Sequence, residues 1–150
     1  MTDIMDIIRA VLVGIGGTII LDIYAFLLQR LFGVPATNWQ MVGRWLGHMP
    51  GGNFIQTNLG QVRPVLGEHV LGWAFHYGIG IGYGLLLVSI WGSKWLFEPG
   101  ITEPLMPGMG MGIAGSQTPK PFVTRLKSMI GHSIFGIGMY LTARLLAAAA

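Results

Sequence analysis

Three stretches of this chain are longer and more apolar than the helices of ordinary soluble domains. They cover residues 7–32, 65–91 and 126–147. A helix needs about 20 predominantly apolar residues to cross the hydrocarbon core of a bilayer. We therefore predict that each stretch is a membrane-spanning helix, and that the first one is a permanent anchor.

The composition agrees with lipid as the surrounding solvent. Only 10% of the 150 residues are charged and 52% are hydrophobic, whereas soluble domains carry about 25% charged residues. The length predicts a single transmembrane domain over residues 1–150. The net charge of +3 comes from basic residues scattered between the apolar stretches, so we expect no nucleic-acid partner. The absence of cysteine excludes disulfides, thiolate metal ligands and cysteine nucleophiles.

A further segment, from about residue 95 to residue 115, is apolar but rich in helix breakers. Its sequence, "WLFEPGITEPLMPGMGMGIAG", holds three prolines and five glycines. Irregular backbone is tolerated at membrane depth only where protein or water satisfies its polar groups. We predict a kinked or broken third span, which makes the fold an all-α integral membrane four-helix bundle.

The connection between the first two spans contains an amphipathic pattern. In "TNWQMVGRWLGHM", the apolar residues recur at helical spacing, with Gln40 and Arg44 on the opposite side. This pattern predicts a helix that lies in the membrane interface, with Trp39 and Trp45 at the level of the lipid headgroups. A simple packed loop helix is the alternative.

Basic residues predict the orientation of the chain. Lysine and arginine are enriched in the cytoplasmic loops of membrane proteins. The first and third connections, with their flanks, hold Arg30, Arg44, Arg63, Lys120, Arg125 and Lys127. We therefore expect these two connections in the cytoplasm and both termini outside.

Five ionisable residues lie within the apolar stretches, namely Asp22, Glu68, His69, His76 and His132. At 1.5 Å rise per residue, four of them are expected in one layer near the cytoplasmic face, with His76 closer to the midplane. Ionisable residues at such depth are costly, and they indicate a functional site by default. Polar residues that only join helices are the alternative. We expect Asp22 to pair with His132, or Glu68 to pair with a histidine.

Small residues recur along the same helix faces. The predicted helix-packing positions are Gly14, Thr18, Gly80, Gly84 and Gly136. Small residues at four-residue spacing let membrane helices approach closely, and polar residues among them bond across the interface. We expect these residues to lie where the spans contact one another.

No catalytic motif is present, so we do not expect an enzyme. The sequence favours a non-catalytic accessory or scaffold subunit whose partners are the lipid bilayer and other membrane subunits or a second copy. The alternative is a small proton-coupled carrier, or a haem- or metal-binding protein, that uses the ionisable residues. No cofactor is predicted, and haem b between His76 and His132 is the alternative because each has a glycine four residues later.

Several segments resemble a known family. The segments are "PGMGMGIAGSQTPKPFVTRLKSMIGHSIFGIGMYL", "GIGGTIILDIYAFLLQRLFGVPATNW" and "GEHVLGWAFHYGIGIGYG". They are similar to the bacterial domain-of-unknown-function family 2938, small integral membrane proteins. The resemblance implies a bacterial inner-membrane protein with about four spans, and it implies no activity. It also implies that Asp22, His76, His132 and the glycine-rich segment belong to a shared pattern.

Overall fold

The structure, a computed structural model, describes residues 3–56, 58–109 and 121–149. The three long helices are α1 (Ile4–Phe32), α3 (Glu68–Trp91) and α6 (Pro121–Ala148). The shorter helices are α2 (Trp39–His48), α4 (Lys94–Phe97) and α5 (Thr102–Met109), and there are 3-10 turns at Met49–Gly51 and Leu59–Gln61. Within these described ranges the chain forms no strand, so the predicted all-α class is confirmed.

Local signals explain where α1 begins and ends. The Asp3 side chain accepts a hydrogen bond from the backbone of Ile4 at 2.7 Å, and Asp6 accepts one from the backbone of Asp3 at 3.3 Å. This reciprocal capping box starts α1 at Ile4, three residues before the predicted start. Gly33, with φ of 66°, ends the helix in the left-handed conformation that glycine adopts without steric cost.

The three long helices are long and apolar enough to cross a membrane, which indicates a membrane protein. They have mean hydropathies of 2.2, 1.4 and 1.2 over their most apolar windows, in chain order. Large apolar side chains such as Phe26, Leu86 and Leu145 are exposed along them, as a lipid-facing surface requires. These helices correspond to the predicted spans 7–32, 65–91 and 126–147.

The predicted third span is divided in the structure. Residues 94–109 form α4 and α5, with a break between Phe97 and Thr102 that contains Pro99. The Trp95 indole donates a hydrogen bond to the carbonyl of Gly100 at 3.1 Å, which holds the break against α4. Residues 110–115 of the predicted span lie outside the described residues. The four-helix bundle with a kinked helix therefore stays a prediction, and the described long helices are three.

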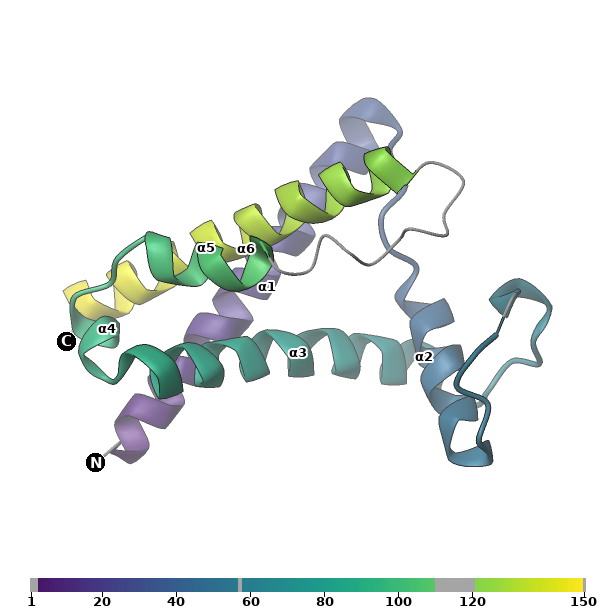
Figure 1. Cartoon of the computed structure of the whole chain (residues 1–150), viewed down its shortest axis with the longest axis horizontal. Helices are drawn as coiled ribbons and strands as arrows, with labels where there is room; N and C mark the ends of the chain where they lie inside the picture. The colour runs from purple at the N-terminus through teal and green to yellow at the C-terminus, as the bar shows by residue number, and fades with distance from the viewer. Residues whose placement is uncertain (1–2, 57, 110–120, 150) are drawn as a thin grey trace.

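Helix α1 is the common neighbour of the other two long helices (Figure 1). Against α3, a Cβ atom on Gly14 would overlap the backbone of Gly80, and one on Gly84 would overlap the carbonyl of Ala10. Against α6, a Cβ on Gly138 would lie 3.0 Å from the Cα of Gly17. Glycine therefore sets the separation of α1 from both partners, as in close-packed membrane helices.

The molecule has two different ends. The start of α1, α4 and the end of α6 gather at one of them, which we name the terminal end (Figure 1). The opposite, α2 end holds α2 and the start of α6, where the Lys127 ammonium donates to the carbonyl of Pro35 at 2.6 Å. The buried apolar core comprises Ala10, Val13, Leu87, Val88, Trp95, Leu96, Met139 and Ala143. These residues come from the parts of the helices nearest the terminal end, so apolar packing is concentrated there.

The α1–α3 crossing gives a test of the fold. Gly84→Val places a branched side chain against the backbone of α1, whereas Gly82→Val on the same helix meets nothing within 4 Å. Overpacking of a close contact costs about 1–3 kcal/mol. We expect Gly84→Val to be less stable than Gly82→Val by that amount in unfolding experiments in detergent micelles. Equal stabilities of the two variants would show that α1 and α3 do not cross at Gly84.

Candidate functional site

A polar cluster joins α1 to α3 at about the middle of both helices. The Nε2 atom of His76 lies 2.8 Å from Oδ1 of Asp22, and the hydroxyl of Tyr77 donates to Oδ2 of the same carboxylate at 3.0 Å. Both oxygens of Asp22 therefore have a partner from α3. The His76 side chain is 7% exposed and the Asp22 side chain is 25% exposed, so the carboxylate is open on one side.

Two tryptophans complete this group. Trp39, the first residue of α2, stacks on the His76 ring with centroids 3.9 Å apart and planes 21° apart. Trp73 meets His76 edge-on at 5.8 Å and lies 6.3 Å from the Tyr77 ring. We name Asp22, His76, Tyr77, Trp39 and Trp73 the Asp22 cluster. It combines one carboxylate, one imidazole and three aromatic rings in a helix interface.

The glycine crossing positions this cluster. His76, Gly80 and Gly84 lie four residues apart on the face of α3 that meets α1. Thr18 sits over Gly80, where its side chain leaves no room for a Cβ atom, and Asp22 lies one turn further along α1. Because Gly80 lets the two backbones approach, a side chain as short as aspartate reaches across to His76.

A second polar group fixes α2 to the start of α3. Arg44 makes two hydrogen bonds of 2.8 Å to Glu68, one to each carboxylate oxygen. Gln40 donates to Glu68 at 2.6 Å and the backbone of Val65 donates at 3.0 Å. The side chains of Arg44 and Glu68 are 11% and 8% exposed. Bidentate arginine–carboxylate pairs are strong and geometrically specific; we name this group the Glu68 clamp.

The clamp changes the interpretation of the amphipathic helix. The predicted helix exists, and its polar residues Gln40 and Arg44 both donate hydrogen bonds to Glu68 of α3. Gly43 allows this, because a Cβ atom there would overlap the carbonyl of Glu68. The hydrogen bonds to Glu68 raise the pKa of the Arg44 guanidinium above its usual value. The helix is therefore joined to α3 by a charged pair and a glycine contact.

The predicted pairings of the ionisable residues were wrong. Asp22 pairs with His76 and not with His132, and Glu68 pairs with Arg44 and not with a histidine. The depth of Asp22 had been counted from Leu28, whereas α1 ends at Phe32, which is ten residues, or about 15 Å, beyond Asp22. His76 lies eight residues, or about 12 Å, inside α3. Asp22 therefore lies at about the same depth along the helices as His76, and not at the depth of Glu68.

The other two histidines lie outside the Asp22 cluster. His69 is exposed and meets Trp73 edge-on at 6.4 Å. The Nδ1 atom of His132 lies 2.7 Å from the carbonyl of Ser128 in its own helix. Among residues 3–56, 58–109 and 121–149, no group of three histidine, aspartate or glutamate side chains is placed to hold a metal ion. Haem b between His76 and His132 stays a prediction.

The remaining predicted residues lie at helix contacts. Gly14, Thr18, Gly80 and Gly84 line the α1–α3 crossing. Gly136 of α6 faces the carbonyl of Pro104 in α5, where a Cβ atom would lie at 2.7 Å. Of the two tryptophans expected at the interface, Trp39 covers His76, and Trp45 donates to the carbonyl of Phe54 at 2.9 Å.

Arg44, Trp73 and Tyr77 were not predicted as site residues from the sequence. The pairing of Arg44 could have been predicted from the sequence. The connection over residues 33–67 contains arginines but no acidic residue, and Glu68 is the first acidic residue after it. For Tyr77, the only indication in the sequence was its position next to His76. A one-residue step on a helix turns by about 100°, and nothing in the sequence indicates that these two side chains reach the same residue of α1.

Apolar helices that enclose a carboxylate–imidazole pair define an all-helical membrane protein with an internal polar cluster. The chain matches the family described as "Protein of unknown function (DUF2938)" over residues 11–106 and 104–146, and it belongs to that family. The comparisons with curated proteins and with solved structures found no match. The resemblance seen in the sequence is thus confirmed. Its description names no activity, so a functional conclusion depends on the geometry.

The Glu68 clamp gives a second test. Arg44→Ala leaves Glu68 without its bidentate partner, and it also removes the hydrogen bonds of Arg44 to the carbonyls of Leu59 and Val62. We expect this variant to unfold at a lower temperature and to be cleaved faster by protease within residues 49–67. Arg63→Ala, an exposed arginine on the same connection, is the matched control and should behave like the wild type. Equal effects of the two substitutions would contradict the clamp.

Proposed function

We propose that this protein is a small proton-coupled membrane carrier in which Asp22 is the group that exchanges the proton. The observation that supports this function is the bonding of one membrane-depth carboxylate by both His76 and Tyr77. Serine and threonine can join membrane helices at a lower cost than an ionisable pair. An aspartate and a histidine at this position therefore favour a chemical role over a packing role.

The charge of the cluster depends on one proton. With His76 protonated and Asp22 ionised, the pair is neutral, and after loss of one proton it carries a single negative charge. A net charge is unfavourable in a low-dielectric environment, so the deprotonated cluster favours a cation in place of the proton.

The surroundings of Asp22 suit a cationic substrate. The carboxylate is open on one side, and Trp39, Trp73 and Tyr77 place aromatic rings around its partner His76. Aromatic faces attract cations, including quaternary ammonium groups. We therefore propose an amine or another organic cation as the substrate, exchanged against a proton at Asp22.

The proposed setting is the bacterial inner membrane, with the α2 end in the cytoplasm and both termini outside. Both α3 and α6 end at the terminal end, whereas α6 begins at the α2 end. The chain between Trp91 and Pro121 must therefore return from one end to the other. This supports the proposal that the broken third segment crosses the membrane as a fourth span, and it agrees with the basic residues of the first and third connections.

If a cationic substrate replaces a proton at Asp22, binding of the substrate should release that proton. A panel of lipophilic and small amines is added to the purified protein in weakly buffered detergent with a pH-sensitive dye. The wild type should release about one proton per chain on binding of at least one panel member. Asp22→Asn should release none, because its amide neither binds a proton in this range nor attracts a cation. His76→Gln should weaken the release.

Glu68→Gln is the matched control, because it removes a buried carboxylate at a different helix contact of α3 that is already paired with Arg44. It should keep the proton release. The carrier proposal is wrong if Asp22→Asn releases protons like the wild type. It is also wrong if no amine of the panel releases protons from the folded wild-type protein.

A second candidate function is an accessory subunit of a larger membrane complex. Gly78 and Gly82 lie on an exposed face of α3, and a Cβ atom at either position would meet nothing within 4 Å. Glycine in a helix interior costs about 1 kcal/mol relative to alanine. Close packing of a further helix would offset this cost. This face therefore favours a partner helix, from another subunit or from a second copy.

Native mass spectrometry of protein extracted from its own membrane tests the accessory function. The wild type should appear in a complex well above 16.2 kDa. The double variant Gly78→Leu with Gly82→Leu should be released from that complex, because the larger side chains keep the partner helix away. Ile90→Leu, exposed on the same helix, is the control and should stay in the complex. A wild type that is monomeric at natural abundance rules this function out.

A further inference from the structure

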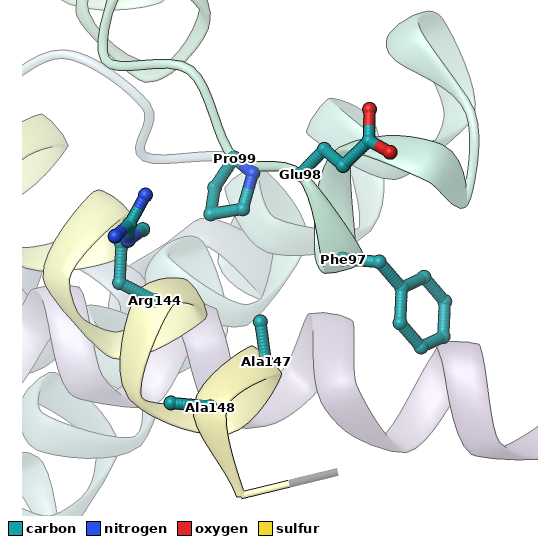
Figure 2. A pocket seen from close by; sticks show the side chains of 6 residues that line it. All are labelled: Phe97, Glu98, Pro99, Arg144, Ala147 and Ala148. Carbon is teal, nitrogen blue, oxygen red and sulfur yellow. The ribbon is translucent and has the colours of Figure 1, made fainter.

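A cavity opens at the terminal end, away from the Asp22 cluster. Its volume is about 470 Å³, and it is lined by Phe97, Glu98, Pro99, Arg144, Ala147 and Ala148. Figure 2 shows α4 and the start of the following break on one side and the last turns of α6 on the other. Four of these six residues are apolar, and Arg144 is the cation among the other two.

The charge of Arg144 is not neutralised by its neighbour in the cavity. The Arg144 side chain extends toward Pro99, whereas the Glu98 carboxylate points away from the cavity (Figure 2). Glu98 is instead paired with Lys94 at 3.3 Å. In the part of the chain that the structure describes, Arg144 is exposed and makes no ion pair.

A second guanidinium at this end, that of Arg9, lies on the Phe97 ring, which points away from Arg144 (Figure 2). The Arg9 guanidinium sits 4.5 Å above the centroid of the Phe97 ring, and Phe97 is a wall of the cavity. Arg144 lies four residues, or about 6 Å, from the end of α6, and Arg9 lies five residues, or about 8 Å, from the start of α1. Long basic side chains near helix ends extend to the headgroup level. Both arginines are therefore within reach of lipid headgroups.

We propose that this cavity binds the phosphate of an anionic phospholipid, with Arg144 as the phosphate-binding residue. Arginine matches the geometry of phosphate oxygens. The apolar walls formed by Phe97, Pro99 and Ala147 suit the glycerol and the first acyl carbons, which free phosphate lacks. The unpaired Arg144 guanidinium disfavours a headgroup that carries its own cation, so phosphatidylglycerol is preferred over phosphatidylcholine.

Native mass spectrometry with defined lipids tests the site. The protein is purified in detergent and mixed with phosphatidylglycerol, phosphatidylcholine or inorganic phosphate. We expect the wild type to retain phosphatidylglycerol and Arg144→Gln to retain it at least tenfold more weakly. Lys94→Gln is the matched control, because Lys94 is a cation at the same end whose charge is already paired with Glu98, and its lipid binding should be unchanged.

Thermal unfolding distinguishes lipid from soluble phosphate. Phosphatidylglycerol should raise the unfolding temperature of the wild type and not that of Arg144→Gln, and inorganic phosphate should raise neither. Equal stabilisation of the wild type by inorganic phosphate would overturn the lipid as ligand. Equal lipid retention by Arg144→Gln and the wild type, or an equal loss in Lys94→Gln, would overturn the site. Retention of phosphatidylcholine as strong as that of phosphatidylglycerol would overturn the preference for an anionic headgroup.

Discussion

The close approach of α1 and α3 is the constraint on which the rest of the structure depends. It exists because Gly14, Gly80 and Gly84 present no side chain where the two backbones meet. In a membrane, water does not drive helices together, so contact between backbones is a main source of association. The same contact brings Asp22 to His76. Fold and site therefore share one structural cause, and a substitution at the crossing changes both.

The two halves of the molecule are held together by different forces. Toward the terminal end, packing is apolar, with residues such as Val13, Leu87 and Met139 fully buried. Toward the α2 end, the contacts between helices are polar: the Asp22 cluster and the Glu68 clamp. Polar contacts can rearrange when a proton or an ion binds, whereas close apolar packing resists such changes. Apolar packing and polar contacts are therefore separated along the length of the helices.

Most of the fold could be predicted from the sequence, because hydropathy and length alone define the spans. The helix-packing glycines could also be placed, since four-residue spacing is a local property. The partners of the ionisable residues could not. Asp22 was assigned to His132 because depth was counted along separate helices, and such counting ignores where α1 ends and how it crosses α3. The role of Arg44 was missed for a related reason: an amphipathic pattern shows which residues share a face and not which helix that face meets.

Helix α2 connects two groups that are far apart in the sequence. One of its ends stacks Trp39 on His76, its middle holds Glu68, and at its other end His48 lies 2.9 Å from the carbonyl of Arg63. The helix is ten residues long and is joined to α3 both at the Gly43–Gly72 contact and through Glu68, so a displacement of α2 would act on both of its ends. A molecule that moves the connection over residues 49–67 would thereby shift the indole on His76. The surface of the first connection and the polar cluster inside the membrane are mechanically linked.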